Sequence, residues 1–303
     1  EGLGGKAIIG FGKAGGGTAG NGEGAQKKGY RHEERSHVAT SSVYYSVFIA
    51  GVPMGNTAGY SLKAATLVWF FYAVTTVLLA VLLSWALYSQ VNYGYPFWYK
   101  QLGIEQHINE YAPQNRFKRG FEQLPPEQHV RAFEQIRDAV HDHGHGLSNI
   151  RYPLPSGQHS LLLHRAEVIH LQDVANLIDA GRWLFVLLLV LWLPLAWCCL
   201  SLGMPAWRGR VVITVIAVMA VLAWLGVVGP TEVFYQFHIW LFPADHQWFF
   251  YWQESLMSTL MKAPALFGGI ALAIALGALL LLPAFYLAGL GIAGRLNTKR
   301  NRK

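Results

Sequence analysis

The chain has 303 residues, of which 53% are hydrophobic and only 14% are charged. A soluble domain usually carries about 25% charged residues, so this composition disfavours a soluble enzyme and favours a membrane protein. The net charge of +7 could suit a nucleic-acid partner, but the basic residues lie where membrane topology accounts for them. We therefore expect no nucleic-acid binding.

The first 60 residues are rich in glycine and contain no long apolar period, so they cannot bury a core. We expect residues 1–60 to form a disordered head and residues 61–303 to form the membrane domain. The chain begins with Glu1, and Met54 stands just ahead of the first long apolar stretch. We therefore expect native translation to start at Met54, which would make residues 1–53 non-native.

A helix needs about 20 consecutive apolar residues to cross a bilayer. Four stretches meet this requirement, roughly Ala64–Tyr88, Trp183–Leu202, Val211–Val228 and Ala265–Leu290. They lack the polar interruptions of a large buried core helix. The sequence predicts an all-α membrane protein with four transmembrane helices.

The basic residues near these stretches predict which side of the membrane each end faces. Arg208 and Arg210 lie between the second and third stretches, and Arg295 and Lys299 follow the fourth. Such segments are usually cytoplasmic, so both termini should lie in the cytoplasm. The segments from about Gln90 to Arg182 and from Gly229 to Pro264 should then lie outside it.

The first outer segment should form a small helical cap over residues 90–163. Pro125-Pro126-Glu127 suits a helix start, and apolar residues follow at helical spacing until Gly144 and Gly146. A second helix is predicted to begin near Leu161 and to run into the second span. The other outer segment is rich in aromatic residues between Phe234 and Trp252, which predicts two short interfacial helices.

Two histidine motifs could carry chemistry. Glu167, His170 and Asp173 are spaced three residues apart, so either carboxylate could accept the Nδ1 proton of His170 and leave Nε2 free as a base. A solvated helix face would explain the same triplet. His238 lies among large apolar groups at the outer end of the third span, where an ionisable residue is often functional. An interfacial histidine bonded to a backbone carbonyl is the alternative, but both motifs should reach the same membrane face.

Other site types have weaker support. His141, His143 and His145 could bind a metal, as could Glu167, His170, His238 and Asp245 together. A ferritin-like di-iron site needs two Glu-x-x-His motifs on its helices, and within the predicted membrane domain only Glu167 to His170 fits. The two cysteines, Cys198 and Cys199, fit buried hydrophobes in the second span, and we assign them no function. The sequence contains no serine elbow or phosphate loop, and we expect no cofactor.

The order of these motifs resembles that of a bacterial integral membrane family that includes the lipoprotein intramolecular transacylase Lit. The resemblance covers about residues 64–295. It is carried by Glu167-x-x-His170-Leu-x-Asp173-Val174 before the second span and by Phe237-His238-x-x-Leu-Phe242 after the third. It implies that an acyl chain moves from the sn-2 ester of a lipoprotein's diacylglyceryl cysteine to the α-amino group of that cysteine. It also implies that His170 and His238 are the essential pair.

This chemistry fits the residues, since aminolysis of an ester needs a base for the amine proton and a donor for the oxyanion. We expect His170 to act as the general base, oriented by Asp173 or Glu167. We expect His238 to protonate or polarise the reacting ester. The reverse assignment stays open. Expected substrate-binding residues are Phe237, Trp240, Phe242 and Arg165.

The expected partners are membrane lipids and lipoprotein substrates. The expected location is the bacterial cytoplasmic (inner) membrane, with the active site facing the periplasm. Two other functions stay open: a membrane protein that binds or transports metal or haem through its histidines, and a non-catalytic assembly factor whose apolar cap docks a partner.

Overall fold

The computed structural model of the protein describes residues 62–300. The predictions for the head, including its disorder and a start at Met54, lie outside the described residues. Within the described range the chain is almost entirely helical, with one antiparallel hairpin of β1 (Arg151–Pro153) and β2 (His159–Leu161). The hairpin was not predicted, because three-residue strands give no usable alternation in the sequence.

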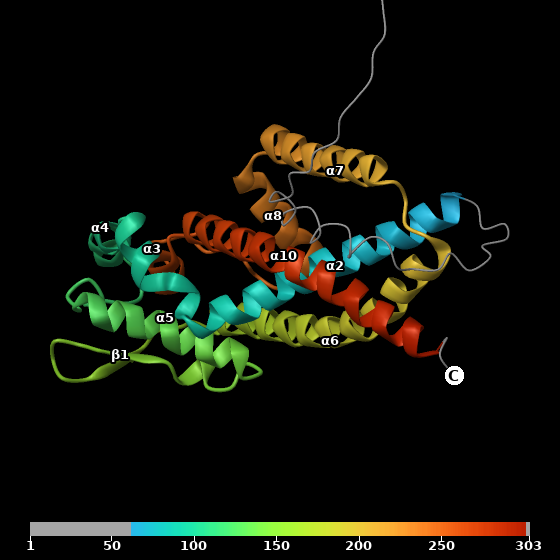
Figure 1. The fold of residues 1–303 in the computed structure, drawn as a ribbon. Coiled ribbons are helices and arrows are strands. Elements are labelled where there is room, and N and C mark those ends of the chain that lie inside the picture. The colour runs from blue at the N-terminus through green and yellow to red at the C-terminus, as the bar shows by residue number, and fades with distance from the viewer. Residues whose placement is uncertain (1–61, 301–303) are drawn as a thin grey trace, which may run out of the picture. The chain divides into compact units, whose positions relative to one another are not determined.

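Four helices are long and apolar enough to cross a membrane, which confirms the predicted number of spans (Figure 1). They are α2 (Leu62–Gln90), α6 (Arg165–Leu202), α7 (Trp207–Val228) and α10 (Ala265–Arg300). At a rise of about 1.5 Å per residue, the 38 residues of α6 extend about 57 Å, well beyond a hydrocarbon core of about 30 Å. The predicted second helix and the second span are therefore one continuous element.

The segment between α2 and α6 forms the predicted cap. Its helices are α3 (Tyr95–Gln101), α4 (Ile104–Tyr111) and α5 (Pro126–His141), joined by the short 3-10 turns η1 (Asn92–Gly94), η2 (Ala112–Gln114) and η3 (Leu147–Asn149). As predicted, α5 begins at the second proline of the Pro-Pro pair and ends just before the glycines.

The segment between α7 and α10 differs from the prediction. It contains α8 (Pro230–Leu241) and a short helix α9 (Leu256–Met261), with no helix or strand in residues 242–255. The prediction of two interfacial helices was therefore wrong for the second one. All six residues of α9 are buried, so α9 belongs to the protein core rather than to a membrane surface.

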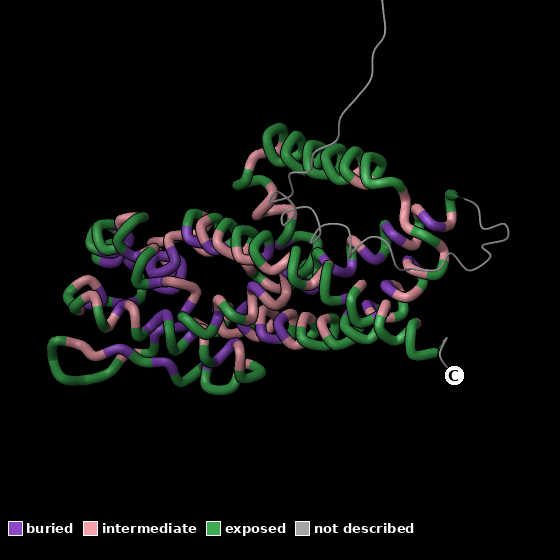
Figure 2. The backbone as a smooth tube through the Cα atoms, in the orientation of Figure 1, coloured by how far each residue is buried: buried purple, intermediate pink, exposed green. Residues whose placement is uncertain are grey.

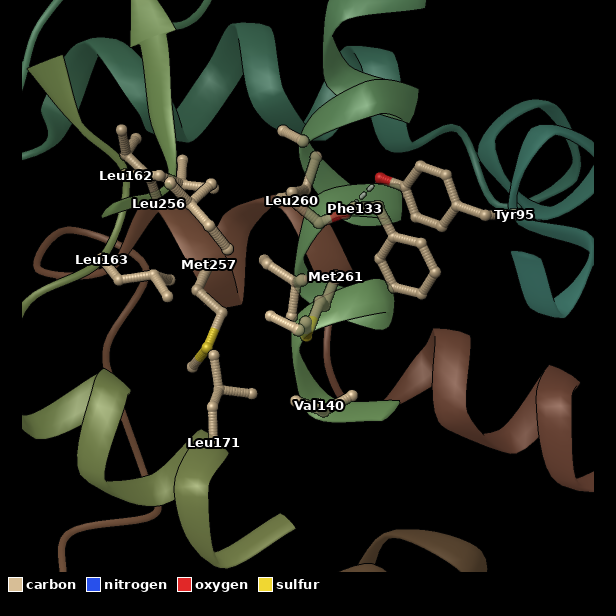
Figure 3. Close-up of a cluster of buried hydrophobic side chains, with 14 of the residues drawn as sticks. Tyr95, Phe133, Val140, Leu162, Leu163, Leu171, Leu256, Met257, Leu260 and Met261 are labelled. Atoms are coloured by element: carbon tan, nitrogen blue, oxygen red, sulfur yellow. Dashed lines mark hydrogen bonds between the residues drawn. The ribbon is translucent and has the colours of Figure 1, made fainter. Parts of the chain in front are cut away.

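The core of the cap is shared with α9 and with the first turns of α6 (Figure 3). The rings of Tyr95 and Phe133 are stacked, with centroids 4.0 Å apart, and the Tyr95 hydroxyl donates a hydrogen bond of 2.7 Å to the carbonyl of Leu260. Leu171 of α6 and Met257 of α9 belong to the same cluster. This shared core fixes the start of α6 and the end of the 242–255 segment against the cap.

Small residues let α10 approach α2 and α6 closely, as is common in membrane helix pairs. A Cβ added to Gly289 would lie 2.5 Å from the Tyr72 hydroxyl and 2.9 Å from Trp192. The Ser84 hydroxyl donates to the carbonyl of Ile274 at 2.8 Å across the same interface.

Helix α7 differs, because none of its 22 residues is buried (Figure 2). Its apolar surface suits contact with lipid.

We predict that Gly289→Ala lowers the thermal stability of the protein in detergent, because the new methyl group forces Tyr72 and Trp192 to move. Overpacking of this kind costs about 1–3 kcal/mol, which corresponds to several degrees in Tm. Gly291→Ala in the same helix is the matched control, since an added Cβ there meets nothing within 4 Å. Equal Tm values for the two variants would contradict the packing described.

Candidate active site

Two histidines from distant parts of the chain meet beside the cap. His170 lies in the second turn of α6, and His238 lies near the end of α8. Their ring centroids are 5.8 Å apart, with 33° between the ring planes, and each residue is only 8% exposed. No hydrogen bond joins the two rings in the described structure, so each imidazole keeps a ring nitrogen that can bond a substrate group.

The tautomer of His238 follows from its partner. Its Nδ1 lies 2.7 Å from the carbonyl oxygen of Phe234, one turn earlier in α8. A carbonyl oxygen can only accept a hydrogen bond, so Nδ1 carries the proton and the neutral ring keeps its lone pair on Nε2. Burial lowers the pKa of His238, which favours this neutral form. His238 is therefore equipped to accept a proton at Nε2.

His170 is held by aromatic packing rather than by a carboxylate. Its ring lies 5.0 Å from that of Phe242 and 6.1 Å from that of Phe250. Its Nδ1 is buried and has no hydrogen-bond partner among the described residues. The prediction that Asp173 or Glu167 accepts a proton from this nitrogen does not hold in the structure, because both carboxylates are bonded to other groups.

Glu167 is fully buried and joins two elements. One carboxylate oxygen accepts a hydrogen bond from the hydroxyl of Ser255, and the other accepts one from the backbone N–H of His164. The second bond caps the start of α6. Lys118 is buried nearby and donates to the carbonyl of Leu162; burial lowers the pKa of Lys118, and Glu167 opposes that shift. Glu167 therefore has structural partners.

Asp173 pairs with a residue outside the predicted site. Its Oδ2 lies 2.6 Å from Nδ1 of His246, in the irregular segment after α8. The hydrogen bond and the charge of Asp173 raise the pKa of His246, with a smaller contribution from Asp245. The side chain of Asp173 is 14% exposed and that of His246 is 35% exposed, so this ion pair lies at the edge of the site.

The irregular segment 242–255, which we call the aromatic strap, packs over both histidines. Phe242 contacts both rings, with centroids 5.0 Å from His170 and 5.2 Å from His238. Trp248 lies 4.8 Å from His238, and Phe250 lies 6.1 Å from His170. The alternate residues Phe249 and Tyr251 are exposed. The strap thus presents one row of aromatic rings to the histidines and another to the surroundings.

The predicted substrate-binding residues occupy different positions. Phe242 is buried and packs beside both histidines, while Phe237 is 45% exposed with its ring 5.6 Å from His238. Trp240 is 71% exposed, and Arg165 is exposed at the start of α6. Trp240 and Arg165 are therefore free to meet lipid or substrate but form no part of the histidine cluster.

The candidate metal ligands are dispersed. Among residues 62–300, no group of three or more His, Cys, Asp or Glu side chains is arranged to hold a metal ion. His141 stacks on Trp85 and hydrogen-bonds the Tyr93 hydroxyl at 2.8 Å, whereas His143 pairs with Asp179 at 2.6 Å. These histidines pack the cap onto α2 and α6.

Sequence analysis missed His246, Trp248 and Ser255. They lie in or beside the aromatic-rich segment that was expected to be helical. In a helix, their spacing would have placed them on different faces, so no shared site was expected. The position of Asp173 on α6 offered a signal, since a partly buried carboxylate needs a partner. The sequence alone does not show which of the chain's histidines or cations supplies it.

Comparisons with known proteins point to one family. The sequence model of a family described as lipoprotein intramolecular transacylase Lit matches residues 65–262, which include both histidines. A solved structure of the membrane integral lipoprotein intramolecular transacylase Lit from Bacillus cereus, a histidine-to-arginine variant, is similar to this chain. The two share 16% sequence identity with a TM-score of 0.48, over 79% of this chain and 95% of that one. A search of curated proteins found no match.

We predict that Glu167→Ala lowers protein stability by about 3 kcal/mol, because it removes two charge-assisted hydrogen bonds and leaves a buried hydroxyl and a backbone N–H unpaired. Thermal unfolding in detergent would measure this loss. Glu254→Ala is the matched control, since Glu254 pairs with Arg116 at the surface and such pairs contribute about 0–1 kcal/mol. A Tm for Glu167→Ala equal to that of the control would contradict a structural role.

Proposed function

The chain belongs to the Lit family of lipoprotein intramolecular transacylases, and from this premise we propose that His170 and His238 catalyse transfer of an acyl chain within a lipoprotein substrate. The acyl chain moves from the sn-2 ester of the diacylglyceryl group to the α-amino group of the same cysteine. The observation that carries the proposal is the 5.8 Å separation of two buried imidazoles from different helices. Family membership favours this acyltransferase activity over metal transport or an assembly role.

The reaction requires little from the protein beyond proton handling. The amine nitrogen attacks the ester carbonyl carbon, a C–N bond forms, and one proton leaves the nitrogen. The tetrahedral oxyanion then collapses, the bond to the sn-2 oxygen breaks, and that oxygen takes up one proton. No proton is gained or lost overall, so one base and one acid suffice. Because amine and ester belong to one molecule, much of the entropic barrier is already removed.

The structure supports the reverse of the expected division between the two histidines. His238 donates Nδ1–H to a backbone carbonyl, so its Nε2 keeps a lone pair and can act as a general base. Nδ1 of His170 has no hydrogen-bond partner among the described residues to fix its tautomer, which makes His170 less suited to lead as the base. We assign proton abstraction to Nε2 of His238 and polarisation or proton donation to His170.

The surroundings of the pair suit an acyl substrate. Phe242, Trp248 and Phe250 bring apolar rings to the histidines, and the exposed Phe237 and Trp240 extend this apolar surface outward. Apolar walls favour an acyl chain, and a site of low dielectric strengthens the hydrogen bonds that stabilise an oxyanion. Membrane lipids and lipoproteins are therefore the partners that we propose.

We further propose that the cap and the histidine pair face the periplasm. The support is the distribution of basic residues, since Arg208 and Arg210 begin α7 and Lys299 and Arg300 end α10. The histidine pair lies near the opposite end of α6 from the α6–α7 connection, since His170 is in the second turn of a 38-residue helix. The substrate would then meet the site in the outer leaflet of the cytoplasmic membrane.

We predict that His170→Ala and His238→Ala each reduce acyl transfer at least a hundredfold while the protein stays folded, because each removes a group that moves or stabilises a proton. Mass spectrometry of lipoprotein N-termini, from cells that produce each variant, would measure the N-acyl lyso-form product. His159→Ala is the control, since His159 is an exposed histidine of the hairpin and belongs neither to the histidine pair nor to the aromatic strap. Normal product levels in either catalytic variant would refute the proposal.

For orientation, we predict that Ser156→Cys, in the exposed hairpin turn, reacts with an impermeant maleimide in intact cells. Thr298→Cys, exposed near the end of α10, should react only after the membrane is permeabilised. Both variants need Cys198→Ala and Cys199→Ala so that the new thiol is unique. Labelling of Thr298→Cys in intact cells would reverse the proposed topology.

A further inference from the structure

The aromatic strap depends on side-chain anchors for its position. Residues 242–255 contain no helix or strand, so no backbone ladder runs along them. Their end is bonded to the cap, where the backbone N–H of Arg116 donates to the carbonyl of Gln253 at 2.8 Å and the Arg116 guanidinium pairs with Glu254. The strap nevertheless supplies Phe242, Trp248 and Phe250, the three rings that pack on the two histidines. Whatever fixes the strap therefore determines how the histidines are enclosed.

Two carboxylates on α6 hold the strap, and they flank His170 at three residues on either side. Glu167 bonds Ser255 at the end of the strap, where both residues are almost completely buried. Asp173 bonds His246 at 2.6 Å, near the strap's beginning and two residues before Trp248. The strap is thus tied to α6 on both sides of His170.

The two anchors differ in character. The Glu167 anchor belongs to the cap core and also caps α6, so its loss would disturb the fold. The Asp173–His246 anchor is partly exposed, so its loss should disturb the fold less. The charge of Asp173 also acts on His170, so His246→Ala is the variant that tests the anchor without removing that charge. The second anchor can therefore be tested separately from the stability of the protein.

A cover over the histidines has a chemical consequence for the proposed reaction. Water could attack the same ester carbonyl if it reached the site. The ester bond to the sn-2 oxygen would then break, and the products would be a free fatty acid and a glyceryl hydroxyl, with no new amide. Closed sites suppress such side reactions by excluding water. Phe242, Trp248 and Phe250 occupy the positions from which they can do so.

We propose that Asp173 and His246 are positioning residues that hold the aromatic strap closed over His170 and His238, so that the acyl chain passes to the amine rather than to water. This inference rests on the proposed transacylase function. It gives the two acidic residues of the Glu-x-x-His-x-x-Asp motif a common task, which is to fasten the strap rather than to orient the imidazole.

The test compares the two products in purified enzyme with a synthetic diacylglyceryl lipopeptide. We predict that His246→Ala and Asp173→Ala raise the ratio of free fatty acid to N-acyl peptide at least tenfold. His246→Asn places an amide N–H donor near the position of Nδ1, so it can still bond Asp173 and should stay within about threefold of the wild-type ratio. The Asp173→Ala, His246→Ala double variant should be no worse than either single variant, because both residues act through one contact.

The chain offers a matched control on the same helix. His143 pairs with Asp179 of α6, also at 2.6 Å, away from the strap. His143→Ala should leave the product ratio within twofold of wild type. Hydrogen–deuterium exchange of peptides covering 242–255 provides a second measurement, and we expect faster exchange in His246→Ala than in His143→Ala.

The outcomes separate this inference from the proposed function. If exchange in the strap and the product ratio both stay unchanged in His246→Ala and Asp173→Ala, the positioning role is overturned. If exchange rises but the ratio does not, the strap is anchored as described and water exclusion is overturned. If the wild-type enzyme forms no N-acyl peptide at all, the transacylase proposal fails, and exchange still decides whether the pair holds the strap.

Discussion

The hydrogen bonds of the buried Glu167 carboxylate are the contacts on which the position of the site depends. A carboxylate with no exposed surface is costly unless it is fully hydrogen-bonded, and Glu167 meets this need with His164 at the start of α6 and Ser255 at the end of the strap. One side chain thereby sets where α6 begins, and with it the position of His170. It also joins α6 to α9 and so to the core of the cap.

Helix α6 connects two environments with different physical rules. Its later turns expose apolar side chains of the kind that face lipid, while its first turns pack into a core shared by the cap and α9. His170 lies near this junction, and its imidazole is buried. We propose that this position brings the histidine pair to the level of the lipid headgroups, because the ester and the amine of a lipoprotein both lie near the interface.

The acidic residues beside His170 illustrate how spacing can mislead. Side chains three residues apart in a helix lie on adjoining faces, so a carboxylate–imidazole bond within the motif was reasonable. In the folded chain, Glu167 and Asp173 bond Ser255 and His246 instead, and both partners come from one irregular segment far along the sequence. The motif therefore combines the residue that we propose to be catalytic with two carboxylates that bond the aromatic strap.

By itself, the sequence determined the four membrane helices, the helical cap, the start of α5 and the family, because apolar length, proline position and ordered motifs are local properties. Topology also indicated that His170 and His238 approach the same end of the bundle. Only the tertiary structure decided the strap, the hairpin, the tautomer of His238 and the partners of Glu167 and Asp173. The strap and the bonds of Glu167 to Ser255 and of Asp173 to His246 depend on contacts between residues distant in sequence, and the tautomer of His238 and the hairpin depend on local geometry. No periodicity along the chain records which donor meets which acceptor.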